Sequence, residues 1–217
     1  TSGDAVVMVL ATIKARIVVN GREQTRDTPL QTNGLVIGTD GLTIMPLSML
    51  DPAELLTRTL SATAGANSKV DVSSETSELR IRVGARELPA TIVLRDSDLD
   101  IVFLKPTEAL TAPVAAIASD GPTPQLLDTL ISMQRSTESF GWGTLASFAV
   151  VQLVVEKPRP YLLASLSTVA GNGLGASMFD TAGRFVGIVA RVAGSRTAPQ
   201  PGVVLAQDIR ELVKQIK

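Results

Sequence analysis

The sequence predicts an all-β protein: two six-stranded antiparallel β-barrels followed by a short C-terminal helix. About a dozen short apolar runs alternate with turn residues at intervals of roughly 8–12 residues, which is typical of barrels and sandwiches. Hydrophobic residues make up 45% of the chain and aromatic residues only 3%, so Val, Ile, Leu and Ala must build the core. Val and Ile favour strands. Two halves with about six runs each favour paired barrels over one sandwich.

In the first half, strands are expected at Ala5–Ile13 and Ala15–Val19, before an Asn-Gly pair that is typical of hairpin turns. The polar stretch Arg22–Asn33 predicts a loop. Pro52–Leu60 has helical spacing with Pro in the first turn, and Ser61–Glu78, rich in Ser, Thr, Ala and Gly, predicts a flexible surface loop. Further strands are expected at Gly34–Gly38, Leu42–Met45, Leu79–Val83, Leu88–Leu94 and Ile101–Leu104.

A crossover between the halves is predicted at Pro106–Pro124, which contains four prolines. The chain therefore divides into an N-terminal barrel (1–110), a C-terminal barrel (111–206) and a terminal helix (207–217). Helical spacing of apolar residues in Asp208–Lys217, with acid first and Lys last, predicts that helix. Strands of the second half are expected at Thr129–Met133, Leu145–Val155, Tyr161–Ala164, Ser177–Phe179, Phe185–Val192 and Val203–Ala206.

Two absences limit the possible chemistry. The chain has no Cys, which excludes disulfides, thiol catalysis and thiolate metal sites, and no His, which excludes Ser-His-Asp and Cys-His hydrolases. The net charge of −1 gives no reason to expect nucleic acid or an anionic membrane as a partner. No apolar run is long enough to span a membrane, so membrane attachment is expected only through segments outside this chain. Because the chain starts at Thr1 without a leader, we expect a mature form or a fragment.

The most informative stretch is Gly171–Val189, GNGLGASMFDTAGRFVGIV. It combines a Gly-rich loop, a short strand, a turn and a second apolar strand. Such loops often present backbone amides to an anion or hold a reactive side chain. Here no nucleophile stands in the loop itself.

Three segments, in this order, resemble the trypsin-like domain of HtrA/Deg-type serine proteases. Gly34–Leu50, GLVIGTDGLTIMPLSML, is similar to the stretch G-x-[VI]-I-x-x-x-G-x-[IV]-[LV]-T-N-x-H-V. Leu79–Lys105 is similar to two strands followed by D-x-x-[TS]-D-[IL]-A-[VL]-[IL]-K. Gly171–Val189 resembles G-N-S-G-G-[PA]-L-x-N-x-x-G-x-[VL]-[IV]-G-[IV]. The resemblance covers most of the chain and implies the trypsin-like double barrel.

The resemblance places a degenerate catalytic triad at Ser48, Asp100 and Leu174. Ser48 stands where the family has its His, Asp100 matches the family's Asp, and Leu174 stands where the family has its Ser; an alternative alignment on G-N puts Gly173 there. Since the chemistry needs hydroxyl, imidazole and carboxylate together, loss of two of the three implies a pseudoprotease. Leu174 is expected to project into the cleft.

The resemblance further implies a vestigial oxyanion loop at Gly171, Asn172, Gly173 and Gly175. It implies a binding or structural module for a protein or peptide ligand, or a part of a larger assembly, and an extracytoplasmic (periplasmic or secreted) location. No cofactor is expected. The oligomeric state and the ligand's identity are left open.

Two alternatives to a pseudoprotease stay open. One is a serine endopeptidase with a rearranged, His-free active site, using a serine with Lys105 or Asp100; no Ser-x-x-Lys spacing occurs. The other is a metal- or anion-binding domain. It would use Asp96, Asp98 and Asp100, although the Gly and Glu that a Ca²⁺ loop requires are missing, or the amides of the loop at Gly171, Gly173 and Gly175.

Four residues have simpler structural interpretations. Asp100 is expected to bond loop amides at a strand start, and Ser48 to hydrogen-bond Asp100. Ser177 is expected in the core and Trp142 in packing rather than ligand binding.

Overall fold

The computed structural model describes residues 2–64, 68–110, 113–115, 123–157, 159–166, 173–192 and 200–216. Within them lie two 3-10 turns, η1 (Ser2–Ala5) and η2 (Glu138–Phe140), and three α-helices, α1 (Leu47–Leu50), α2 (Ala53–Ala64) and α3 (Ala206–Val213). The strands are β1 (Val6–Val19), β2 (Arg22–Val36), β3 (Thr43–Pro46), β4 (Val70–Val83), β5 (Arg86–Asp96), β6 (Ile101–Pro106), β7 (Thr129–Arg135), β8 (Thr144–Val155), β9 (Tyr161–Ala164), β10 (Ser177–Asp180), β11 (Phe185–Val192) and β12 (Gln200–Leu205).

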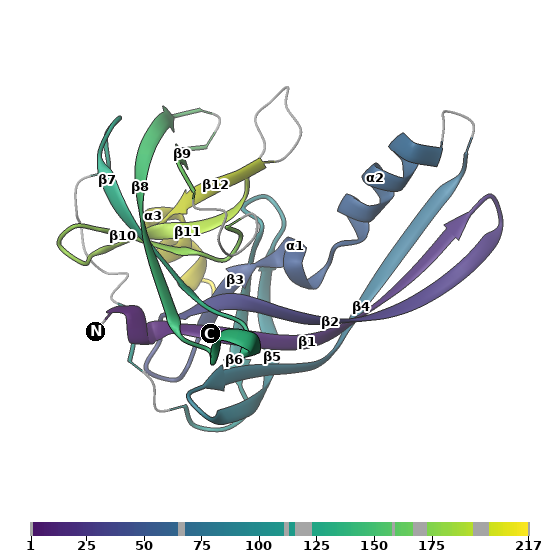
Figure 1. The fold of residues 1–217 in the computed structure, drawn as a ribbon, viewed down its shortest axis with the longest axis horizontal. Coiled ribbons are helices and arrows are strands. Elements are labelled where there is room, and N and C mark those ends of the chain that lie inside the picture. Colours follow the sequence, from purple (N-terminus) through teal and green to yellow (C-terminus); the bar gives the residue numbers. More distant parts are fainter. Residues whose placement is uncertain are drawn as a thin grey trace.

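The strands form two closed antiparallel barrels of six strands each, as the sequence predicts (Figure 1). The first has the order β1-β2-β3-β6-β5-β4 and the second β10-β11-β12-β9-β8-β7. The first barrel ends at Pro106 and the second begins at Thr129, with the proline-rich crossover between them. Closure pairs each of these described strands with two neighbours in its barrel wall.

Three hydrophobic clusters hold this arrangement. One fills the first barrel around Val9, Met45 and Ile81, and another fills the second around Met178 and Val189. The third joins the barrels and includes residues from both, with α3 packed onto it: Val6, Leu35, Phe103, Phe179, Ile188, Val204, Ile209 and Leu212. The described residues of the two clusters inside the barrels include no aromatic side chain, whereas the cluster between them contains Phe103, Tyr161, Phe179 and Phe185.

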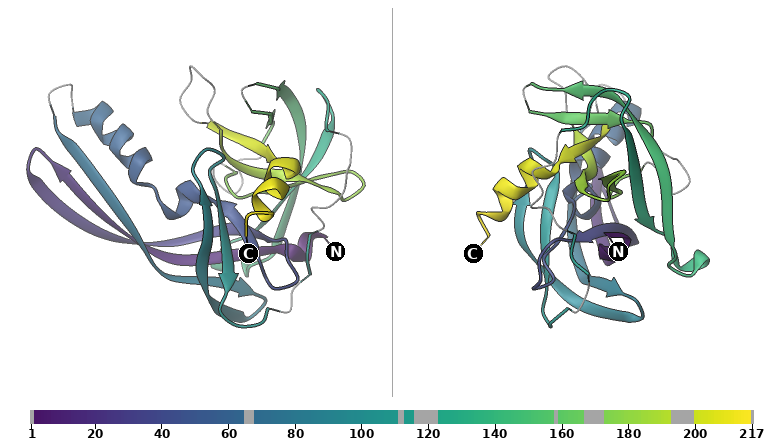
Figure 2. Two further views of the ribbon diagram at one scale, coloured as in Figure 1. Left: turned by 180° about the vertical axis from the view of Figure 1, so that it is seen from behind. Right: turned by 90° about the vertical axis from the view of Figure 1, so that its left-hand side faces the viewer.

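A ribbon projects from the first barrel, and here two sequence predictions are wrong. Arg22–Asn33, predicted as a loop, belongs to β2 and pairs with β1 out to Val19↔Arg22 (Figures 1 and 2). Ser61–Glu78, also predicted as a loop, contains the end of α2 and most of β4, which pairs with β1 down to Val19↔Val70. Backbone pairing does not require apolar side chains, and in a projecting ribbon most side chains are exposed, so polar sequence is compatible with strands.

The helices are placed close to their predicted positions. α2 contains all of the predicted helical stretch except Pro52, continues to Ala64 and packs along β4. α3 begins at Ala206, two residues before the predicted start, and ends at Val213 rather than Lys217. Among the described residues, none of the helices has the length and apolar character that crossing a membrane requires.

Candidate functional site

Asp100 lies at the point where the first barrel meets the second. It stands directly before β6, 7% exposed, with a left-handed backbone at φ +56°, a conformation that Asp tolerates better than most non-glycine residues. The Leu47 N–H donates to the Asp100 carbonyl oxygen over 2.9 Å. The backbone of Asp100 therefore fixes the start of α1.

The Asp100 carboxylate accepts three hydrogen bonds. The Ser48 N–H donates to Oδ1 over 2.6 Å, and the Ser48 hydroxyl donates to Oδ2 over 2.9 Å. The Arg191 N–H, from β11 of the second barrel, donates to Oδ2 over 2.7 Å. The expected hydrogen bond between Ser48 and Asp100 is present, and so are the expected bonds to backbone amides. The carboxylate caps α1 and joins the two barrels.

Burial raises the pKa of the Asp100 carboxyl group above its usual range, although the hydrogen bonds from Arg191 and Ser48 and the charge of Arg191 pull it down. Desolvation outweighs these donors. The Asp100 carboxylate is buried and both of its oxygens accept hydrogen bonds, from two backbone amides and one hydroxyl. Its role in this arrangement is structural.

The structure contradicts the expectation that Leu174 projects into the cleft. Leu174 is 6% exposed and belongs to the core of the second barrel, against which Met49 of α1 also packs. An apolar side chain gains more from this core than from water. The place that the resemblance assigns to the nucleophile is therefore inside a hydrophobic cluster.

The glycine loop is described only in part, since Gly171 and Asn172 lie outside the described residues. Gly173 and Gly175 have left-handed backbones at φ +74° and +82°. A Cβ on Gly175 would lie 2.8 Å from the Asn33 carbonyl oxygen, so the loop packs tightly against the first barrel. The Gly175 N–H donates to the Val189 carbonyl over 2.8 Å, which uses that amide within the fold.

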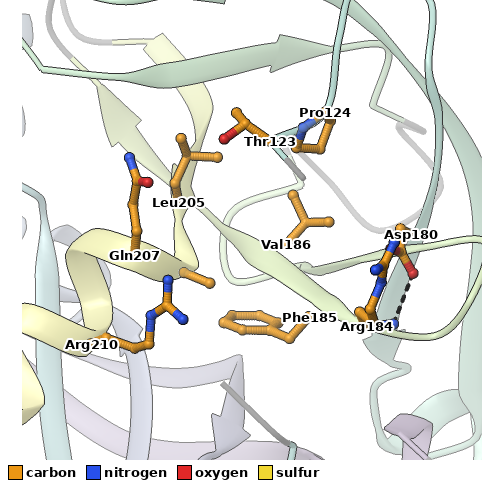
Figure 3. A pocket seen from close by; sticks show the side chains of 10 residues that line it. Thr123, Pro124, Asp180, Arg184, Phe185, Val186, Leu205, Gln207 and Arg210 are labelled. Carbon is orange, nitrogen blue, oxygen red and sulfur yellow. Dashed lines mark hydrogen bonds and ion pairs between the residues drawn. The ribbon is translucent and has the colours of Figure 1, made fainter. Parts of the chain in front are cut away.

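Next to Asp100 lies a cavity of about 380 Å³. Its walls come from α1, α2, the turn between β5 and β6, and β11: Leu47, Ser48, Asp51, Glu54, Leu55, Arg58, Ser97, Asp98, Asp100 and Arg191. A second cavity, between α3 and the turn before β11, measures about 50 Å³ and has room only for a few waters (Figure 3). Two hollows of larger volume, about 690 Å³ at the tip of the β1–β2 hairpin and about 420 Å³ on α3, are each lined by one surface element or hairpin. The cavity beside Asp100 is lined by residues of both barrels, so it is the better candidate for a ligand site.

The three aspartates before β6 do not converge. The Asp96 carboxylate accepts from the Leu99 N–H over 2.8 Å, and Asp98 pairs with Arg159 at 3.0 Å. In the described part of the chain, no group of three or more His, Cys, Asp or Glu side chains could hold a metal ion.

Three other residues singled out from the sequence have structural surroundings. Lys105 is paired with Asp40 at 2.7 Å, and no described serine is hydrogen-bonded to it. Ser177 is fully buried in β10, as expected. Trp142 packs under the Arg82 guanidinium, 4.5 Å from the ring centre, which agrees with the packing interpretation.

Sequence reasoning missed Arg191 and the helical wall formed by Asp51, Leu55 and Arg58. One clue to Arg191 existed: it is a charged residue in the apolar strand FVGIVARV. The sequence predicted the helix that carries Leu55 and Arg58 but not its place beside Asp100, because that depends on how α2 packs on the projecting ribbon.

These features define a trypsin-like double β-barrel, with a carboxylate between the barrels and a cavity beside it. More particularly, the fold is that of HtrA-type protease domains. The structure is similar to the MamO protease domain from Magnetospirillum magneticum in its apo form, with a TM-score of 0.62, 16% identity and coverage of 98% of this chain and 97% of that one.

It is also similar to a variant of the HtrA-type protease AlgW solved with a tripeptide, with a TM-score of 0.63, 14% identity and coverage of 99% of this chain. This chain spans 60% of that AlgW chain. No protein-family model matches the sequence. No curated protein matches it either. At these identities the comparisons establish the fold.

Proposed function

We propose that this domain does not hydrolyse peptides and instead binds a peptide or protein segment in the cavity beside Asp100. The observation that carries the proposal is the set of donors on Asp100: two backbone amides and the Ser48 hydroxyl. In a triad the carboxylate orients an imidazole, and this chain contains no His.

The remaining chemistry supports the same proposal. A carboxylate is a poor acceptor for a serine proton at neutral pH, because the two pKa values lie far apart even when burial raises that of the acid. Leu174 has no nucleophilic atom and is packed in the core. Without a strong base and a nucleophile in the loop, the fold retains only the cavity.

The choice of a peptide as ligand rests on the shape and chemistry of the site. The cavity of about 380 Å³ has the size range of ligand pockets and combines apolar walls with several polar groups. The similar AlgW structure was solved with a tripeptide. The properties of the cavity and the tripeptide of that similar structure together lead us to propose a peptide as the ligand.

Hydrolysis and binding can be tested together on the purified domain. We expect no turnover of fluorogenic casein from mildly acidic to mildly alkaline conditions and no labelling by a fluorophosphonate probe. Turnover that persists through purification and is abolished by Ser48→Ala would instead support the His-free endopeptidase and refute the proposal.

Binding is tested by fluorescence anisotropy with labelled random seven-residue peptides. We expect saturable binding to the wild type. Leu55→Trp should weaken it, because the larger side chain fills the cavity, and this result would support the proposed site. Absence of binding by every peptide pool would refute the peptide-binding function.

A further inference from the structure

Arg191 is a charged residue in the mostly buried strand β11, and its side chain is not satisfied by hydrogen bonds within the described residues. It lies in β11 and lines the cavity, while its backbone N–H is bonded to Asp100. Its Nε atom is buried without a hydrogen-bond partner, the only nitrogen of this guanidinium in that condition. Within the described ranges, its side chain has no ion pair and no hydrogen bond.

The other charged groups that line the cavity all have partners. Glu54 pairs with Arg58 at 3.0 Å, and Asp98 pairs with Arg159 at 3.0 Å. Asp51 accepts a 2.6 Å hydrogen bond from the Ser74 hydroxyl, and the carboxylate of Asp100 has its three donors. Among the described residues, the Arg191 guanidinium is thus the one charged group of the lining without an ion pair or a hydrogen bond.

A guanidinium without an ion pair or a hydrogen bond can bind an added anionic acceptor. Its five N–H donors form a planar fork that fits a carboxylate with two parallel bonds, and such charge-assisted pairs are the stronger class of hydrogen bond. Because Nε is buried, a ligand in the cavity can reach this guanidinium only through its two terminal nitrogens, Nη1 and Nη2. An anionic group entering the cavity would meet this donor pair without displacing an existing partner.

We propose that Arg191 is the specificity-determining residue of the cavity and receives a carboxylate of the bound peptide. The inference rests on the proposed peptide-binding function and adds the chemistry of the ligand. Leu47 of α1 and Leu55 of α2 provide apolar surface for the aliphatic part of the same ligand.

The charge of the walls limits which carboxylate peptides fit. The lining contains four carboxylates and two guanidinium groups, a formal charge of −2. No long-range attraction of anions results, so recognition depends on direct contact with Arg191. The ligand is therefore a peptide with a single carboxylate among neutral or apolar residues, and a polyacidic peptide is disfavoured.

The test compares four pools of fluorescein-labelled random seven-residue peptides made without other acidic residues. Two pools carry a central Glu or Gln with an amidated C-terminus, and two carry a central Gln or Leu with a free C-terminal carboxylate. Anisotropy is measured with the wild type, Arg191→Gln, and the control Arg26→Gln, which removes the same charge from the exposed part of β2. Thermal unfolding of each variant confirms folding.

We expect one carboxylate source, the Glu side chain or the C-terminus, to bind at least about tenfold more tightly than the amidated Gln pool, and Arg191→Gln to abolish that preference. Arg26→Gln should keep it. If peptides bind but the amidated Gln pool binds equally well, or if the preference survives in a folded Arg191→Gln protein, the carboxylate inference is wrong while peptide binding stands. If no pool binds the wild type, the proposed function itself fails.

Discussion

The substitution Asp100→Asn tests whether the buried carboxylate holds the structure. Asn keeps the shape of the side chain but replaces one acceptor oxygen with an NH₂ donor. If the amide oxygen faces Arg191, the NH₂ group meets the Ser48 N–H that now lies 2.6 Å from Oδ1. If it is flipped, the NH₂ group meets the Arg191 N–H that lies 2.7 Å from Oδ2.

Either orientation leaves one buried backbone N–H without an acceptor, at a cost of about 1–3 kcal/mol. Removal of a buried charge works in the opposite direction, since burial raises the pKa of Asp100 and so disfavours its ionised form in the fold. We expect the lost acceptor to dominate and to lower the free energy of unfolding by about 2 kcal/mol. For a chain of this length that corresponds to a fall in Tm of about 4–8 °C.

The assay is equilibrium unfolding in urea at neutral pH, followed by the fluorescence of the single tryptophan and by circular dichroism. Asp98→Asn is the matched control, because the same change is made two residues away on a 72% exposed side chain in a surface ion pair. Surface pairs of this kind contribute about 0–1 kcal/mol, so the control should be close to the wild type.

An Asp100→Asn protein at least as stable as the wild type would refute this reasoning. It would mean that the cost of burying the charge exceeds the value of the three donors. Equal losses for Asp100→Asn and Asp98→Asn would also refute it, because burial would then make no difference.

Three further predictions concern pH and packing. The pKa of Asp100 is raised in the folded state, so protonation of this carboxyl group stabilises the fold. This contribution is fully present below the unfolded pKa of about 3.9 and is lost as pH rises through the folded pKa. The difference in free energy of unfolding between the wild type and Asp100→Asn should therefore widen on acidification. A constant gap in urea titrations would contradict this. Arg82→Gln should change the emission of the single tryptophan and lower the free energy of unfolding by about 1 kcal/mol, because the Arg82 guanidinium lies over its ring. Arg80→Gln, which removes the other arginine paired with Glu87, should leave the emission unchanged. Gly175→Ala should lower Tm clearly more than Gly21→Ala, because both have φ near +80° but only the first meets a backbone oxygen at 2.8 Å; equal losses would exclude a packing effect.

The fold class could be predicted from the sequence because the strands and turns of a barrel produce a regular alternation of apolar runs and turn residues. Short β-branched runs between turn residues reflect burial on one side of a strand and a sharp return of the chain, and both are local. In the ribbon, β1 has such apolar runs, but the parts of β2 and β4 that pair with it do not, because their mostly exposed side chains need not be apolar. Its strands are set by backbone pairing with β1, which sequence pattern does not encode.

The candidate site divides in the same way. The sequence alone determined that no imidazole or thiol is present, and it singled out Ser48 and Asp100 as a pair. Only the tertiary structure decided that Leu174 lies in the core, and that in the described part of the chain the Arg191 side chain lines a cavity with its Nε atom unbonded, because burial and pairing depend on segments distant in the chain. Asp100 shows this most clearly: its donors come from residues 52 positions before it and 91 positions after it, and only the packing of the two barrels brings them together.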